Sequence, residues 1–146
     1  MKSRLTIPAL LIALASFAIL TSAQKPAAPA ATKGQSTCPV SGKSIDKAKS
    51  PHVDYQGQRI YFCCEHCPAK FKADPEKYFD KLAKDGIVLE NIQTTCPVSG
   101  EKLENKDNFV DYKGRRVYFC CPKCPAEFKK DPAKYLAKLP GDQPKA

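Results

Sequence analysis

The 146-residue sequence contains no tryptophan, one methionine and only two histidines. It also lacks the motifs on which common enzymes depend, since it has no paired carboxylates, no nucleophile beside a base and no phosphate-binding glycine loop in a suitable setting. After residue 23, no segment is long and apolar enough to span a bilayer. These absences predict a protein that is not an enzyme and whose mature chain does not insert stably into a membrane.

The first 23 residues have the three-part design of a secretory signal peptide. Lys2 and Arg4 precede an apolar run from Leu5 to Leu20, and small residues up to Ala23 provide a cleavage site. We therefore expect a cleaved signal and an exported protein, either periplasmic or secreted.

The remaining chain is small, basic and rich in cysteine. A module of about 50 residues buries too little apolar surface to be stable by itself and needs disulfides or a metal as reinforcement. The eight cysteines are the candidates for that role. The net charge of +9 comes from lysines scattered among acidic residues rather than gathered in a stripe, so we expect no nucleic acid as a partner.

An internal repeat organises the chain from Thr37 onward. The hexapeptide Thr37–Gly42 recurs at 95–100, and the block from Val53 to Ala69 recurs at 110–126. The offset falls from 58 to 57, so one residue is missing between Gly100 and Val110, where we predict an exposed loop. The predicted organisation is a signal peptide at 1–23, a linker at 24–36, a first module at 37–86, a connector at 87–94, a second module at 95–141 and a tail at 142–146.

Each copy has an α+β pattern. Alternating β-branched and aromatic residues around Gln56-Gly57 and Lys113-Gly114 predict a β-hairpin. Proline near the start of the next segment predicts a short helix, and Asp74-Pro75 or Asp131-Pro132 predicts a capped second helix. We expect the aromatic residues of these elements to form the core: Tyr61, Phe62, Phe71, Tyr78 and their second-copy counterparts.

The cysteines have the same arrangement in both copies. One early cysteine, Cys38 or Cys96, precedes a late cluster where the hairpin strand meets the helix. Unpaired amides at a helix start lower thiol pKa values and favour thiolates, the form that binds metals. Two thiolates there and a third from a loop match a compact zinc-finger-like site. The late clusters are Cys63-Cys64-x-x-Cys67 and Cys120-Cys121-x-x-Cys124.

On these residues the two copies resemble YHS or TRASH domains, which are small treble-clef-like modules. The resemblance rests on Cys-Pro-Val-Ser-Gly, Val-Asp-Tyr-x-Gly-x-Arg, Tyr-Phe-Cys with a cysteine four positions later, and Asp-Pro-x-Lys-Tyr. It implies a knuckle loop, a β-hairpin and one or two short helices per module, and a role in heavy-metal binding. It also implies metal ligation by Cys63, Cys67, Cys120 and Cys124, while Ser41 and Ser99 stand where the family commonly has its early cysteine.

Cys64 and Cys121 supply a fourth thiol to each copy, and they are either ligands that complete a tetrahedral site or free thiols. His66 is replaced by Lys123 in the second copy, so we interpret it and His52 as surface residues. Sulfur ligands suit zinc(II) and copper(I), and we expect about one ion per module and a metal transporter or other metal-handling protein as a partner.

Two further interpretations of the cysteines remain open. A disulfide-stabilised secreted interaction domain agrees with an oxidising compartment. A thiol oxidoreductase would use Cys64 with Cys67, and Cys121 with Cys124, as redox pairs, although no thioredoxin-like alternation of strands and helices surrounds either pair.

Overall fold

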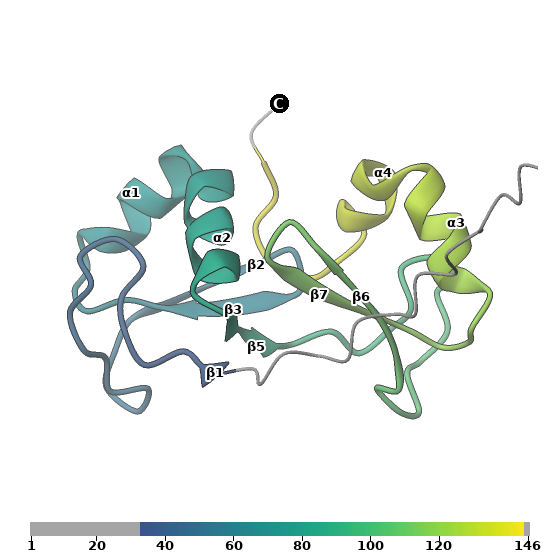
Figure 1. Ribbon diagram of the computed structural model, residues 1–146, viewed down its shortest axis with the longest axis horizontal. Helices are drawn as coiled ribbons and strands as arrows, with labels where there is room; N and C mark the ends of the chain where they lie inside the picture. Colours follow the sequence, from purple (N-terminus) through teal and green to yellow (C-terminus); the bar gives the residue numbers. More distant parts are fainter. Residues whose placement is uncertain (1–32, 145–146) are drawn as a thin grey trace, which may run out of the picture.

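The structure is a computed structural model that describes residues 33–144. The predicted signal peptide, 1–23, and the first part of the predicted linker, 24–32, lie outside the described residues. Two α+β modules lie side by side, each with its helices on one side of a hairpin (Figure 1). The fold class predicted from the repeat is confirmed. Among the described residues, no helix has the length and apolar character needed to cross a membrane.

The first module is built from short strands and two helices. β2 and β3 form an antiparallel hairpin that β5 extends to three strands, and β1 pairs in parallel with β4. The elements of this half are β1 (Lys33–Gly34), β2 (His52–Tyr55), β3 (Gln58–Tyr61), α1 (Cys67–Ala73), α2 (Pro75–Lys84), β4 (Ile87–Val88) and β5 (Glu90–Asn91).

The second module repeats the hairpin and the helix pair. Its two strands pair antiparallel over five residues each. The elements are β6 (Asn108–Tyr112), β7 (Arg115–Phe119), α3 (Cys124–Lys130) and α4 (Pro132–Leu136). The segment from Gly100 to Val110, which has lost one residue relative to the first copy, precedes and enters β6 and is mostly exposed, in agreement with the predicted loop.

The local signals in the sequence explain these elements. Both central residues of each hairpin turn have positive φ, with 44° at Gln56, 79° at Gly57, 45° at Lys113 and 74° at Gly114. This is the turn conformation whose twist matches a two-residue β-hairpin. The second helices begin as predicted, because the side chains of two aspartates accept hydrogen bonds from backbone N–H groups three residues later, in Asp74 to Lys77 and Asp131 to Lys134.

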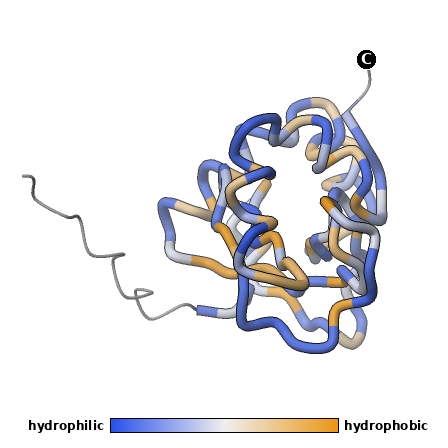
Figure 2. Tube along the Cα trace, turned by 90° about the vertical axis from the view of Figure 1, so that its right-hand side faces the viewer, coloured by the Kyte–Doolittle hydropathy of each residue, from blue (hydrophilic) through white to orange (hydrophobic). Residues whose placement is uncertain are grey.

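Each module has its own apolar core between hairpin and helices. Phe62 and Phe71 are fully buried in the first core, as are Phe119 and Phe128 in the second. Tyr61 is also buried, whereas Tyr78 is partly buried at the margin of the first core. Hydrophilic stretches follow the outer bends of the chain (Figure 2). The predicted aromatic core is therefore present in both copies, except that Tyr118, the counterpart of Tyr61, is only half-buried and lies outside the second core.

The two modules contact each other through their hairpin turns and second helices. The guanidinium of Arg115 in β7 lies 3.7 Å from the ring centre of Phe79 in α2, is 1% exposed, and forms an ion pair with Glu76. The side chains of Gln58 and Asn91 both donate to the carbonyl oxygen of Arg116, at 2.8 Å each. These contacts hold the modules with their second helices facing inward, so that the first helices lie at the outer ends (Figure 1).

The predicted connector and tail take part in this arrangement. β5, from the predicted connector, pairs with β3, and the backbone N–H of Asp142, from the predicted tail, donates to the carbonyl of Asp54 at 2.7 Å. Residues outside the two repeated blocks therefore also pack against the first module.

The tight approach of Gly114 to α2 yields a stability prediction. A Cβ atom at Gly114 would overlap the backbone carbonyl of Phe79, whereas one at Gly100, which also has positive φ, would meet nothing within 4 Å. Both Gly114→Ala and Gly100→Ala strain the backbone, but only the first forces the modules apart. We expect Gly114→Ala to lower the free energy of unfolding by about 1–3 kcal/mol more than Gly100→Ala, measured by urea denaturation. Equal losses would show that the modules are not tightly packed here.

Candidate metal centre

The early cysteine of each module lies in a tight knuckle turn. The backbone N–H of Cys38 donates to the carbonyl of Lys43, and the N–H of Gly42 donates to the carbonyl of Cys38, both at 2.8 Å. Cys96 makes the same pair of bonds with Glu101 at 2.7 Å and Gly100 at 2.8 Å. Because the glycine has a positive φ, the chain reverses at once, and the cysteine sulfur is enclosed beneath the turn.

The late cysteines lie at the point where the hairpin ends and the first helix begins. Cys63 follows β3 by two residues, and Cys67 is the first residue of α1. Cys120 directly follows β7, and Cys124 is the first residue of α3. The loop between strand and helix turns the two sulfurs of each pair toward one another, at 3.7 Å in both modules.

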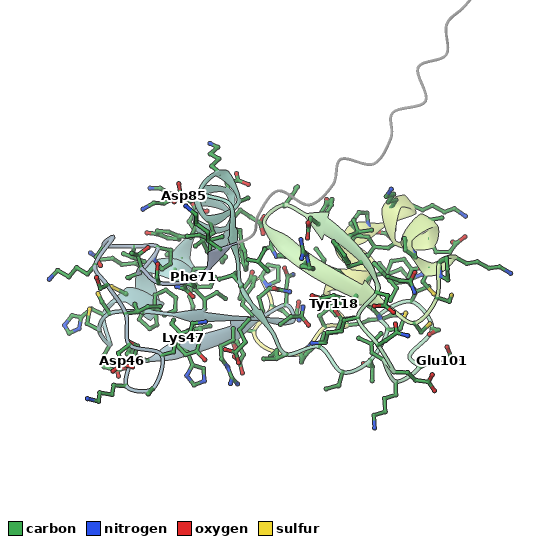
Figure 3. The ribbon with its side chains drawn as sticks, turned by 60° about the horizontal axis from the view of Figure 1, so that its bottom comes forward. Asp46, Lys47, Phe71, Asp85, Glu101 and Tyr118 are labelled. Atoms are coloured by element: carbon green, nitrogen blue, oxygen red, sulfur yellow. The ribbon has the colours of Figure 1, made fainter. Side chains whose placement is uncertain are left out.

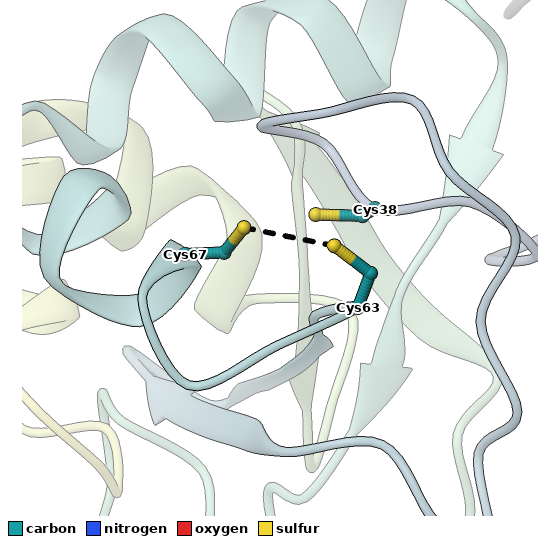
Figure 4. Close-up of side chains that lie close together, drawn as sticks. All are labelled: Cys38, Cys63 and Cys67. Atoms are coloured by element: carbon teal, nitrogen blue, oxygen red, sulfur yellow. Dashed lines mark hydrogen bonds between the residues drawn. The ribbon is translucent and has the colours of Figure 1, made fainter.

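Three sulfurs converge in each module. The Sγ atoms of each group all lie within 4.8 Å of one another, although they come from segments more than 20 residues apart. Figure 4 shows the group of the first module. Two members of each group are buried and one is half-buried. The groups are Cys38, Cys63 and Cys67 in the first module, and Cys96, Cys120 and Cys124 in the second.

The spacing of these sulfurs fits a metal. Zinc–thiolate bonds of about 2.3 Å in a tetrahedral site place neighbouring sulfurs about 3.8 Å apart. The Cys63–Cys67 and Cys120–Cys124 separations of 3.7 Å match that value. The other separations within each triad are at most 4.8 Å, so each triad can hold one metal ion once its sulfurs close in on the ion.

The fourth thiol of each module lies beside the triad rather than within it. The sulfur of Cys64 lies 3.8 Å from that of Cys63 and 3.4 Å from that of Cys67. The sulfur of Cys121 lies 3.3 Å from that of Cys124. Cys64 is exposed and Cys121 is half-buried. Ligation by this pair stays a prediction.

Two buried glutamines position the triads, and the sequence analysis did not identify them. The Gln35 side chain donates to the carbonyls of Thr37 at 3.1 Å and Tyr61 at 2.7 Å, and accepts from the Tyr61 N–H at 3.0 Å. It thereby ties the knuckle to the strand that leads to Cys63. Gln93 makes the equivalent bonds to Thr95 and Tyr118.

A signal for these glutamines was present in the repeat. Gln35-Ser36-Thr37-Cys38 and Gln93-Thr94-Thr95-Cys96 share the pattern Gln-x-Thr-Cys at the offset of 58. Gln35 fell within the predicted linker because residues 24–36 are rich in Ala, Pro, Lys and Gly, and Gln93 fell within the predicted connector. The structure buries both side chains, so residues just before Thr37 and Thr95 pack with the modules.

Serine occupies the fourth position of each knuckle and contacts a triad sulfur. The hydroxyl of Ser41 lies 3.1 Å from the sulfur of Cys63, and that of Ser99 lies 3.2 Å from the sulfur of Cys120. The Ser41 hydroxyl can donate a hydrogen bond to a thiolate at this distance, whereas the Ser99 hydroxyl donates its one proton to the carboxylate of Glu101 and can accept from the Cys120 thiol. The serines thus support the site without being sulfur ligands.

The knuckle cysteines have strongly lowered thiol pKa values. Burial raises the pKa of Cys38, but hydrogen bonds from the Ser41 hydroxyl and from backbone N–H groups, including that of Cys63, outweigh burial and lower the pKa to about 6. The same balance lowers the pKa of Cys96 to about 7. These thiols form thiolates near neutral pH even before a metal arrives.

The late cysteines divide into two kinds, which corrects one expectation. Backbone and cysteine hydrogen bonds before the helix lower the pKa values of Cys64 and Cys121, as predicted. The prediction was wrong for Cys67 and Cys124. Burial, followed by hydrogen bonds with neighbouring cysteines, raises the pKa of each thiol despite its place at a helix start.

Neither histidine joins a triad. His66 is exposed and caps α1 without a side-chain hydrogen bond, and the ring of His52 lies beside Tyr61 with 5.7 Å between ring centres. Among the described residues, the metal-ligand atoms that converge in the two triads are therefore all cysteine sulfurs.

The fold and the site define a class of protein: a duplicated small α+β module in which each copy gathers cysteine thiols into a site for a heavy metal. The YHS domain family matches residues 37–81 and 94–138, which is more than half of the chain. The chain belongs to the YHS domain family, and the resemblance predicted from the sequence is confirmed.

One curated protein gives a more distant match. The chain is 29% identical over 80 residues to a silver exporting P-type ATPase of Salmonella typhimurium. The alignment covers 55% of this chain and 9% of the ATPase, so the similarity concerns a small part of that protein. No solved structure matches the chain.

The lowered pKa values of Cys38 and Cys96 yield a spectroscopic prediction. In the reduced, metal-free protein, thiolate absorbance in the ultraviolet should rise in a first step as the pH passes about 6 to 7. The double variant Cys38→Ser/Cys96→Ser should lose that step. The prediction fails if absorbance in the unaltered protein rises only near the ordinary thiol pKa of about 8.5.

Proposed function

We propose that the protein is exported and binds zinc(II) or copper(I) at two cysteine sites, one ion per module. Its role would be in metal handling, metal sensing or metal-dependent stability outside the cytoplasm. The observation that carries the proposal is the convergence of three sulfurs within 4.8 Å of one another, with one pair at tetrahedral spacing, repeated in both modules.

The character of the donors supports soft and borderline metals. Thiolate ligands select copper(I) and zinc(II), whereas calcium and magnesium require oxygen ligands. The name of the matched ATPase refers to silver(I), a soft monovalent ion similar to copper(I). A partner that transports or carries such ions agrees with both observations.

We further propose that Cys64 and Cys121 each act as the fourth thiolate ligand of their site. Cys64 and Cys121 lie close enough to the triads to complete a tetrahedron after a small shift, and both have lowered thiol pKa values. Because Cys64 is exposed, the fourth ligand would lie on the solvent side and could leave or join the metal more readily than the other three.

A thiol oxidoreductase is the second candidate, and one observation favours it. Cys64 is exposed with a lowered pKa, while Cys67, 3.4 Å away, is buried with a raised pKa. An attacking thiol and a resolving thiol need that difference. A two-cysteine redox reaction leaves the convergence of Cys38 on the same point unexplained, and we therefore favour metal binding. Insulin reduction would reveal the redox activity.

A disulfide-stabilised interaction domain is the third candidate. All eight cysteines are free thiols in the structure. Adjacent cysteines such as Cys63 and Cys64 seldom pair with one another, so a disulfide scaffold would need separate distant partners for them. Counting free thiols before and after chelation separates this candidate from a metal site.

Metal stoichiometry tests the proposal directly. We expect about two ions per chain after anaerobic purification from the native compartment, measured by mass spectrometry of the metals. Replacing the three triad cysteines of one module with serine should leave about one ion, whichever module is changed. The matched control is His52→Ala/His66→Ala, which should keep two ions. Full metal content in both triad variants would refute the site.

Cobalt(II) substitution tests the fourth ligand. If Cys64 and Cys121 are bound, Cys64→Ser/Cys121→Ser should remove about a quarter of the sulfur-to-cobalt charge-transfer absorption, because one thiolate of four is lost at each site. An unchanged spectrum would show that both are free thiols and that the triads bind metal without them.

A further inference from the structure

The two triads have the same backbone geometry, but the residue that directly follows the knuckle glycine differs in charge between the modules. Lys43 and Glu101 occupy equivalent positions in the repeat, and each accepts the N–H of the knuckle cysteine through its carbonyl, at 2.8 and 2.7 Å. Each also donates its own N–H to the knuckle serine, at 3.4 and 3.2 Å. The fold thus holds a lysine in the first module where it holds a glutamate in the second.

Glu101 is linked to a triad sulfur through a single hydroxyl. The oxygen of Ser99 lies 3.2 Å from the sulfur of Cys120 and 3.3 Å from the carboxylate of Glu101. The carboxylate and Cys120 also share the wall of a surface pocket of about 470 Å³. Figure 3 shows Glu101 at the outer end of the second module. The lining residues are Glu101, Lys102, Glu104, Asn105 and Cys120.

The net charges of the surrounding loops differ in the same direction, with the more negative loop in the second module. Residues 42–51 carry three lysines and one aspartate, a net charge of +2, whereas residues 100–109 carry two lysines and three acidic residues, a net charge of −1. On the helix side the difference is opposite, since Lys123 replaces His66 and Pro122 replaces Glu65. A test must therefore change the knuckle position alone.

We propose that Glu101 is a specificity-determining residue, which biases the second site toward divalent ions relative to the first site, where Lys43 takes its place. The inference rests on the proposed function, because it assigns different preferences to the two metal sites. A carboxylate interacts with a divalent ion about twice as strongly as with a monovalent one at the same place. The first site has no carboxylate at the equivalent position.

Coulomb's law bounds the size of the effect. One extra unit of metal charge roughly 5 Å from a carboxylate changes affinity by about fourfold at the dielectric constant of water, and by about 250-fold at an effective value of about 20. Because Glu101 is exposed and screened by salt, we expect a value near the lower end, about tenfold.

A charge swap within the full chain tests the inference with all eight cysteines intact. One equivalent of zinc(II) or silver(I) is added to the reduced, metal-free protein, and brief alkylation followed by peptide mass spectrometry measures which module is protected. In Lys43→Glu/Glu101→Lys the charge changes by two units in each module, so the ratio of second-module to first-module protection should fall more for zinc(II) than for silver(I), by well over the roughly tenfold expected for the Glu101 charge alone. Equal shifts for both ions, or no shift, would overturn the inference.

The chain offers a matched control at another repeated position. Lys70 in α1 and Glu127 in α3 are equivalent, exposed and opposite in charge. Lys70→Glu/Glu127→Lys makes the same charge exchange away from the knuckles and should leave both ratios unchanged. An equally large effect of this control would show that overall module charge, not Glu101, sets the preference.

A milder variant protects the test from changes in folding. Glu101→Gln keeps the size and removes the charge, and it should shift the zinc(II) ratio in the same direction but by less than the swap. If neither ion protects either module of the unaltered chain, the proposed function itself fails, and the inference fails with it.

Discussion

The structure depends on bringing an early thiol and two late thiols to one point. The knuckle turn fixes Cys38, the start of α1 fixes Cys67, and the loop after β3 fixes Cys63. The Gln35 side chain joins these parts, because it bonds to the backbone on both sides of the gap between knuckle and strand. A buried amide with its bonds satisfied resists movement, since breaking any one of them leaves an unpaired polar group.

Duplication compensates for the small size of each module. The two apolar cores are separate clusters, and each is too small for comfortable stability by itself. The hairpin turn of the second module packs on α2 of the first module and adds buried surface. The guanidinium of Arg115 stacks on the ring of Phe79 in this contact. Since this contact lies between the modules, both knuckles remain at the outer ends, where metals and partners can reach them.

The sequence predicted the repeat, the hairpins, the capped helices and the family, because each follows from local rules such as Asp-Pro at a helix start. It could not predict which residues from distant segments would be buried together. Gln35 and Gln93 were missed since their burial depends on the tertiary fold. The raised pKa of Cys67 was also missed, because the effect of burial exceeds that of the helix start. The inward packing of the tail at Asp142 has no local signal at all.

The central claim is that sulfur atoms alone hold the metal in each module. X-ray absorption at the metal edge of the anaerobically isolated protein tests it most directly, because the method reports the atoms in direct contact with the ion. The account predicts a shell of sulfur neighbours at about 2.3 Å for zinc, and no shell of lighter atoms in their place. A first shell made mainly of oxygen or nitrogen would contradict it.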